Sequence, residues 1–137
     1  MEIAIALNTG LNSLLLDPDG GGAGGKKRMT TKYDYIENLT DLVPEILKDS
    51  IVSRTFYEDE RLKVILFGFS EGQELSEHTA SQPAMLHFLE GEAMVKLGAD
   101  EHHAHAGTWI HMPAHLPHSV QATKSTLMLL ILYQDLG

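Results

Sequence analysis

The sequence predicts an all-β domain, a sandwich or closed barrel of about eight to ten short strands. Beyond the first third of the chain, short apolar or alternating segments recur about every ten residues, separated by glycine, proline and charged turns. The clearest are "IVSRTFY" (51–57), "RLKVILFGF" (61–69) and the two halves of "MLHFLEGEAMVKL" (85–97), where Gly91 marks a hairpin turn. The run "STLMLLILY" (125–133) is almost continuously apolar, which is typical of a buried strand.

The N-terminal part of the chain has a different composition. The stretch "DPDGGGAGGKKR" (17–28) holds five glycines in six positions, which predicts a flexible linker. We therefore expect residues 1–28 to be an N-terminal peptide plus linker, either an added or fused segment or a native arm, and 29–137 to be the folded domain. The segment 38–49, with Pro44 near its start, predicts a turn or two of helix before the strands begin.

Composition and charge exclude several classes of protein. The 137 residues have a net charge of −9, whereas nucleic-acid and anionic-membrane surfaces need basic patches. Cysteine is absent, which excludes disulfides, thiolate metal sites and cysteine nucleophiles. No apolar run approaches the roughly 18 residues of a membrane-spanning helix, and no secretory signal is apparent. We therefore expect a cytoplasmic protein.

The histidines form the main candidate for chemistry. All eight lie between residues 78 and 118, and imidazole is the commonest metal-binding side chain. No close-spaced motif such as HExxH is present, so a site must be assembled from residues far apart in the chain. In "DEHHAHAG" (100–107), a strand would place His103 and His105 on one face and His102 on the other. With Asp100 and Glu101 adjacent, the stretch could capture a loosely held metal ion, but we favour a solvated strand edge.

Two stretches of the chain resemble the two motifs of the cupin superfamily. In the first, Gly72 is followed after five residues by His78, and Gly91 closes the motif. The second, in "GTWIHMPAHLPH", is matched by Gly107, Pro113 and His118. The chain is most similar to small, single-domain bacterial cupins of the cupin-2 type, most of them uncharacterised. The resemblance implies a double-stranded β-helix, or RmlC-like jelly-roll barrel, a ligand pocket inside it, and a homodimer.

The chain departs from the family at positions that would hold a metal. Ala80 stands where the family has its second histidine, and Ala84 where it has its glutamate. His115 replaces a turn glycine, and we expect it to lie exposed at the mouth of the barrel. Of the four family ligands only His78 and His118 remain, whereas a catalytic metal site usually has three protein ligands and an open position.

A third ligand depends on which way two further histidines point. Side chains alternate between the two faces of a strand, so an inward-facing Ala84 decides which of the following side chains point inward. The alternation predicts that Leu86, Phe88, Ile110 and Met112 face inward, and that His87 and His111 face outward with Trp109 unless a bulge inverts them. The predicted pocket residues are Ala80, Ala84, Leu86, Phe88 and Met112.

Three hypotheses for function remain at this point. In the first, a divalent ion (Zn, Ni, Fe, Mn or Cu) is bound by His78, His118 and His111, with His87 as the alternative third ligand. A small organic molecule lies beside the ion, and the protein is an oxygenase or isomerase type of enzyme. In the second, the pocket is free of metal and binds or senses a small molecule without catalysis. In the third, the barrel is a scaffold that presents the peptide 1–28. The sequence does not decide whether the protein is an enzyme.

Overall fold

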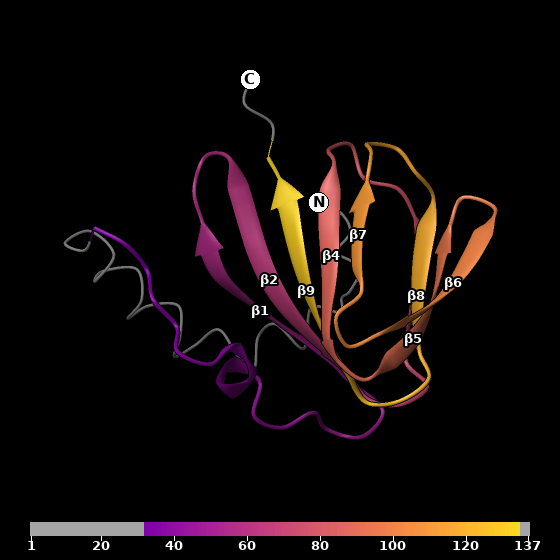
Figure 1. The fold of residues 1–137 in the computed structure, drawn as a ribbon, viewed down its shortest axis with the longest axis horizontal. Coiled ribbons are helices and arrows are strands. Elements are labelled where there is room, and N and C mark those ends of the chain that lie inside the picture. The colour runs from indigo at the N-terminus through magenta and orange to yellow at the C-terminus, as the bar shows by residue number, and fades with distance from the viewer. Residues whose placement is uncertain (1–31, 135–137) are drawn as a thin grey trace.

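Residues 32–134 are described by the computed structural model, and they fold into two antiparallel β-sheets that face each other (Figure 1). The larger sheet has the order β1-β2-β9-β4-β7, from β1 (Ile51–Glu58), β2 (Leu62–Phe69), β9 (Thr126–Tyr133), β4 (Ala84–Glu90) and β7 (Trp109–Met112). The smaller sheet has the order β3-β8-β5-β6, from β3 (Glu74–His78), β8 (His118–Ala122), β5 (Glu92–Leu97) and β6 (Asp100–His105). The all-β, jelly-roll prediction is confirmed.

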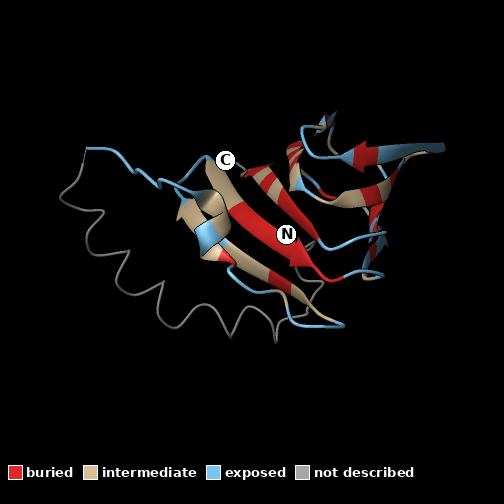
Figure 2. Ribbon diagram, turned by 60° about the horizontal axis from the view of Figure 1, so that its bottom comes forward, coloured by how far each residue is buried: buried red, intermediate tan, exposed pale blue. Residues whose placement is uncertain are grey.

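Alternation of side chains explains how these strands build one core. Along β4, Ala84, Leu86 and Phe88 are buried, while the residues between them are only partly covered. Burying a side chain the size of Phe88 contributes about 1.5–3 kcal/mol compared with leaving it exposed. In Figure 2 the buried residues lie along the strands where the two sheets meet, and the exposed ones lie mostly in loops and at strand ends.

Strand β9 occupies the centre of the larger sheet. It pairs with β2 on one side and with β4 on the other, so both of its edges are hydrogen-bonded within the sheet. Its sequence is apolar at almost every position because the residues on its inner face join the main core and two on its outer face, Leu127 and Leu129, join a second cluster. The continuous apolar run therefore marks a strand that is paired on both edges and packed on both faces.

The predicted N-terminal helical turn is present as a short 3-10 helix, η1 (Leu39–Leu42). The side chain of Asn38 caps it by accepting from the backbone N–H of Thr40 at 3.1 Å. The helix ends before Pro44, so the expectation that this proline would stand near its start was wrong. A proline disfavours helical backbone in the residue before it, and Val43 is indeed non-helical, with φ −133° and ψ 73°.

The segment after η1 covers the outer face of the larger sheet. Val43 packs in a second apolar cluster with Val52, Leu66 and Leu127, and Ile46 packs against that cluster. The approach to the sheet is close at Gly68, where an added Cβ would lie 2.9 Å from Cγ1 of Ile46 and 3.0 Å from Cγ1 of Val43. A glycine in the middle of β2 thus lets this segment lie flat on the strand.

The predicted peptide and linker, 1–28, lie outside the described residues. Within residues 32–134 no helix is long and apolar enough to cross a membrane.

The predicted hairpin turn at Gly91 is present between β4 and β5, with φ +93°. Beside it, the buried hydroxyl of Thr126 accepts from the backbone N–H of Glu92 at 3.1 Å and lies 2.7 Å from the Lys124 carbonyl oxygen. This hydroxyl therefore connects the hairpin to the start of β9.

We predict that Gly91→Ala destabilises the protein much more than Gly72→Ala does. Both glycines have positive φ, +93° and +90°, so both substitutions carry backbone strain of about 1 kcal/mol. At Gly91 the added Cβ would also press against the Ser125 carbonyl oxygen and lie 2.6 Å from Cα of Thr126, which adds about 1–3 kcal/mol. At Gly72 nothing lies within 4 Å. Urea unfolding of both variants measures the difference, and equal losses of stability would contradict it.

Candidate functional site

Strands β3 and β8 bring together the two histidines that match the cupin motifs. The strands pair antiparallel, and His78 and His118 are direct partners across the ladder. Their imidazole rings lie 4.3 Å apart between centroids, with an angle of 62° between the ring planes. The two side chains therefore occupy one place although they are far apart in the sequence.

Both imidazoles are held by the same kind of hydrogen bond. Nδ1 of His78 lies 2.6 Å from the carbonyl oxygen of Ser76, and Nδ1 of His118 lies 2.8 Å from that of Leu116. A carbonyl oxygen only accepts hydrogen bonds, so each Nδ1 carries the hydrogen and donates it. In the neutral ring the lone pair is then on Nε2. This arrangement, with Nδ1 bonded to the backbone, is the usual support of a metal-binding histidine.

The two histidines differ in their exposure to solvent. His118 is 7% exposed, whereas His78 is only partly buried. Burial lowers the pKa of His118 below its ordinary value of 6.5, the hydrogen bond to the Leu116 carbonyl opposes this in part, and the nearby His78 lowers the pKa further. At neutral pH His118 is therefore an uncharged imidazole, the form that accepts a proton or binds a metal ion.

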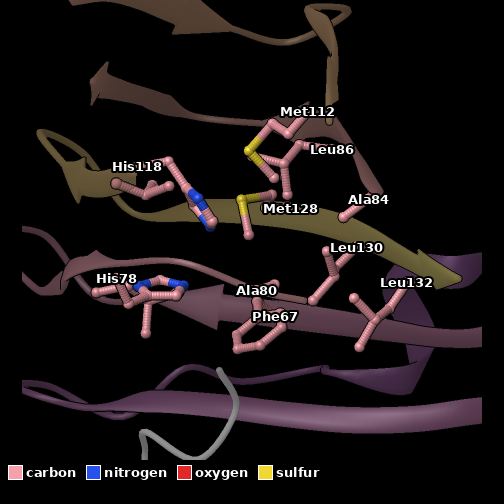
Figure 3. Close-up of a pocket in the computed structure, with 12 residues that line it drawn as sticks. Phe67, His78, Ala80, Ala84, Leu86, Met112, His118, Met128, Leu130 and Leu132 are labelled. Carbon is pink, nitrogen blue, oxygen red and sulfur yellow. The ribbon is translucent and has the colours of Figure 1, made fainter. Parts of the chain in front are cut away.

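A narrow pocket adjoins the two rings inside the barrel. Figure 3 shows the imidazoles of His78 and His118 at one end and Leu132 at the other. The cavity has about 20 Å³ of free volume, enough for about one ordered water molecule. Apart from the two imidazoles the lining is apolar, and it consists of Phe67, Leu75, Ala80, Ala84, Leu86, Met112, Val120, Met128, Leu130 and Leu132.

The structure places four of the five predicted pocket residues on this lining. Ala80 and Ala84 lie there with His78 and His118, so the four positions of the family's ligand set converge although two of them are alanine. Phe88 is fully buried but belongs to the core away from the cavity. The other apolar lining residues lie on β2, β3, β8 and β9 and were not predicted, because a strand sequence does not distinguish a cavity wall from packed core.

His87 and His111 lie on the opposite face of the larger sheet. In the pairing of β4 with β7, His87 is opposite Trp109 and His111 is opposite Met85. Their inward neighbours Ile110 and Met112 are buried, whereas His111 is exposed and Trp109 is 59% exposed. The structure thus brings neither His111 nor His87 to the imidazole pair, and it shows the outward direction that strand alternation predicted.

The other histidines lie outside the pocket. His115 is exposed with φ +68°, the left-handed backbone for which the family uses glycine, and its N–H donates to the Ala80 carbonyl oxygen at 2.7 Å. His103 pairs with Glu92 at 3.3 Å on the outside of the smaller sheet. In the part of the chain that the structure describes, no group of three or more histidine, aspartate or glutamate side chains is arranged to hold a metal ion.

We predict that His118 titrates below pH 6.5 and that both pocket histidines carry their hydrogen on Nδ1 when neutral. Because the folded state lowers the pKa of His118, the unfolded chain takes up the proton first as the pH falls. The stability that His118 contributes is therefore complete above pH 6.5 and is lost as the pH falls from there to the folded-state pKa. Nitrogen-15 NMR of the imidazoles measures both properties. A midpoint at or above 6.5, or hydrogen on Nε2, would contradict the assignment.

Comparison with known proteins agrees with the fold and with the motif positions. A family model described as "Cupin domain" matches residues 65–133, a range that contains both pocket histidines. A search of curated proteins finds no match to the chain. The resemblance stated from the two motifs is therefore confirmed at the level of the family.

Solved structures of bacterial proteins are similar over most of the described residues. A protein of unknown function from Streptococcus pyogenes is 28% identical, with a TM-score of 0.68, and the match covers 77% of this chain and 91% of that one. A cupin 2 conserved barrel domain protein from Leptotrichia buccalis is 31% identical, with a TM-score of 0.66, over 71% of this chain and 47% of that one. A salicylate 1,2-dioxygenase from Pseudaminobacter salicylatoxidans is 13% identical, with a TM-score of 0.57, over 60% of this chain and 26% of that one, and shares the fold alone.

Proposed function

Because the chain belongs to the cupin family, we propose that it binds a divalent metal ion through Nε2 of His78 and Nε2 of His118, with a small organic molecule in the adjoining pocket. The observation that carries the proposal is that Nδ1 of each ring makes a hydrogen bond to a backbone carbonyl oxygen. It fixes the tautomer of both rings before any ion arrives, so little ordering remains to be done on binding.

Because the pocket supplies only two metal-binding imidazoles, we expect it to bind a divalent ion with low affinity. Two imidazoles occupy two coordination positions, and the positions of the other two family ligands are Ala80 and Ala84, which carry no donor atom. His111, the third ligand expected from the sequence, and His87, its alternative, lie on the far face of the sheet. The remaining coordination positions would be open to water or to a bound molecule. Such an ion would act as a Lewis acid or, as iron or copper, would activate oxygen.

The shape of the pocket limits the organic molecule. The free volume is about that of one water molecule, so a larger ligand must displace lining side chains or extend through the mouth. The apolar lining favours a hydrocarbon body with one polar group placed at the imidazoles. An oxygenase or isomerase type of reaction is the enzyme class that we propose, and the similarity in fold to a salicylate 1,2-dioxygenase is consistent with it.

We predict that His78→Ala and His118→Ala each abolish measurable binding of Ni²⁺ or Zn²⁺, because a single imidazole holds a divalent ion too weakly. The matched controls are His87→Ala and His111→Ala, which remove imidazoles from the outer face and should leave binding unchanged. Isothermal titration of protein without an affinity tag gives the affinity and stoichiometry. Binding that survives in the two pocket variants, or that is lost in the controls, would refute the site.

The same site can be tested by adding ligands. In Ala80→His/Ala84→Glu both missing side chains would enter the pocket, since both alanines line it. The affinity for Ni²⁺ should rise by about tenfold or more. The double variant must first be shown to fold, by circular dichroism. If it folds and its affinity equals that of the unmodified protein, the four positions do not form a metal site.

A metal-free binding pocket is the second candidate function, and the two alanines favour it. They make the cavity wall apolar and remove the anionic ligand that would offset the charge of a divalent ion. His78 and His118 would then bind a polar group directly. A thermal-shift screen separates the two candidates, because a ligand of the native state raises its stability. Stabilisation by organic compounds in the presence of a chelator supports this alternative, and stabilisation by metal ions alone supports the first.

We also propose that residues 29–137 form a homodimer through the outer face around Trp109. This side chain is 59% exposed on β7, an edge strand of the larger sheet, and exposed aromatic residues are typical of interfaces. Residues 1–28 would then be an appended segment, for which the barrel serves as carrier in the scaffold hypothesis.

We predict that Trp109→Glu converts the dimer to a monomer, whereas deletion of 1–28 leaves the dimer and its melting temperature unchanged. Tyr35→Glu is the control, since Tyr35 is 77% exposed and belongs to the segment before η1, which lies on the β1 side of the larger sheet in Figure 1. Analytical ultracentrifugation gives the mass of each form. A dimer that persists in Trp109→Glu, or one that is lost when 1–28 is deleted, would overturn this assignment of the interface.

A further inference from the structure

Two thioethers lie in the same pocket as the imidazole pair. Met112 comes from β7 and Met128 from β9, and both line the cavity with exposures of 2% and 1%. In Figure 3 both side chains lie toward the end of the pocket occupied by His118, away from Leu132. The lining therefore offers four polarisable donor atoms. Two imidazole nitrogens come from β3 and β8 of the smaller sheet, and two sulfurs come from β7 and β9 of the larger sheet.

The pocket offers no negative charge to a metal ion. None of the lining residues in the described part of the chain is acidic, and Ala84 stands at the family's glutamate position. Burying an ion in an apolar cavity is costly unless an opposite charge offsets it, and the cost rises with the charge of the ion. At a neutral set of donors the desolvation cost is therefore smaller for a monovalent ion than for a divalent one, which would be held only loosely.

The softness of the donors points in the same direction. Thioether sulfur is a soft ligand that binds Cu(I), whereas Mn²⁺ and Mg²⁺ prefer oxygen and Zn²⁺ and Ni²⁺ bind imidazole without needing a thioether. From the donor set and its lack of charge together, we infer that the pocket is a Cu(I) site formed by His78, His118, Met112 and Met128. The inference rests on the proposed function for the two imidazoles, and it assigns the metal and two ligands that the family motifs do not contain.

The opposing interpretation is that the two methionines only fill space, which is the commonest role of buried methionine. Methionine and leucine have similar volumes, and exchanging them in a core usually costs less than about 1.5 kcal/mol. The substitution to leucine therefore removes the sulfur while keeping most of the packing, and it separates a ligand from a packing residue.

The test is Cu(I) binding under anaerobic conditions, measured by competition with a colorimetric chelator, for the unmodified protein and for Met112→Leu/Met128→Leu. We expect the double variant to lose about tenfold or more of its Cu(I) affinity, with its Ni²⁺ affinity changed by less than about twofold. Met85→Leu/Met94→Leu is the matched control, because neither Met85 nor Met94 lines the pocket. X-ray absorption of the copper-loaded protein should show sulfur neighbours that disappear in Met112→Leu/Met128→Leu.

The outcomes separate this inference from the proposed function. Equal Cu(I) affinity in the unmodified protein and in Met112→Leu/Met128→Leu, or a copper spectrum without sulfur, overturns the thioether site while divalent binding can persist. Loss of Cu(I) binding in the leucine variant, together with no divalent binding by the unmodified protein, supports the Cu(I) site and refutes the divalent proposal. An equal loss of Cu(I) and Ni²⁺ affinity in a folded leucine variant shows a packing role and overturns the inference.

Discussion

The structure depends on the burial of one face of each strand in a single space between two sheets. In β4, β7 and β9 every second residue enters that space, and this alternation decides which side chains can meet. The pocket is the part of the space that the side chains do not fill. Ala80 and Ala84 both line it, and their side chains are too short to fill it. The site is thus a place in the core where the side chains are too small to fill the space between the sheets.

Much of the fold followed from the sequence because its signals are local. The hairpin at Gly91, the buried run of β9 and the outward direction of His87 and His111 all depend on residues close together in the chain. The resemblance to the two cupin motifs also implied that His78 and His118 share one pocket. The helical turn was misplaced relative to Pro44, because the proline was interpreted as a starting residue rather than as a barrier to the preceding one.

The finer parts of the site depend on contacts that no sequence pattern encodes. The hydrogen bonds from each Nδ1 to a carbonyl arise where β3 and β8 pair, and the register of that pair shifts between Leu75 and His78. The nearly continuous apolar sequence of β9 gives no sign of a cavity, yet Met128 lines it from the sheet opposite the two histidines. A residue's place on a cavity wall is a property of two sheets at once, and only the assembled structure supplies it.

The central position of β9 also has a consequence for how the chain folds. The last of the described strands lies between β2 and β4, and its partners are tens of residues earlier in the chain. During synthesis β2 and β4 therefore emerge before the strand that joins them, with their hydrogen-bonding edges uncovered. Contacts of this long range slow folding, and unpaired strand edges are prone to aggregate. The barrel is completed only when its final strand inserts at the middle of the sheet, so the time before that insertion is when the nascent chain most needs protection by a chaperone.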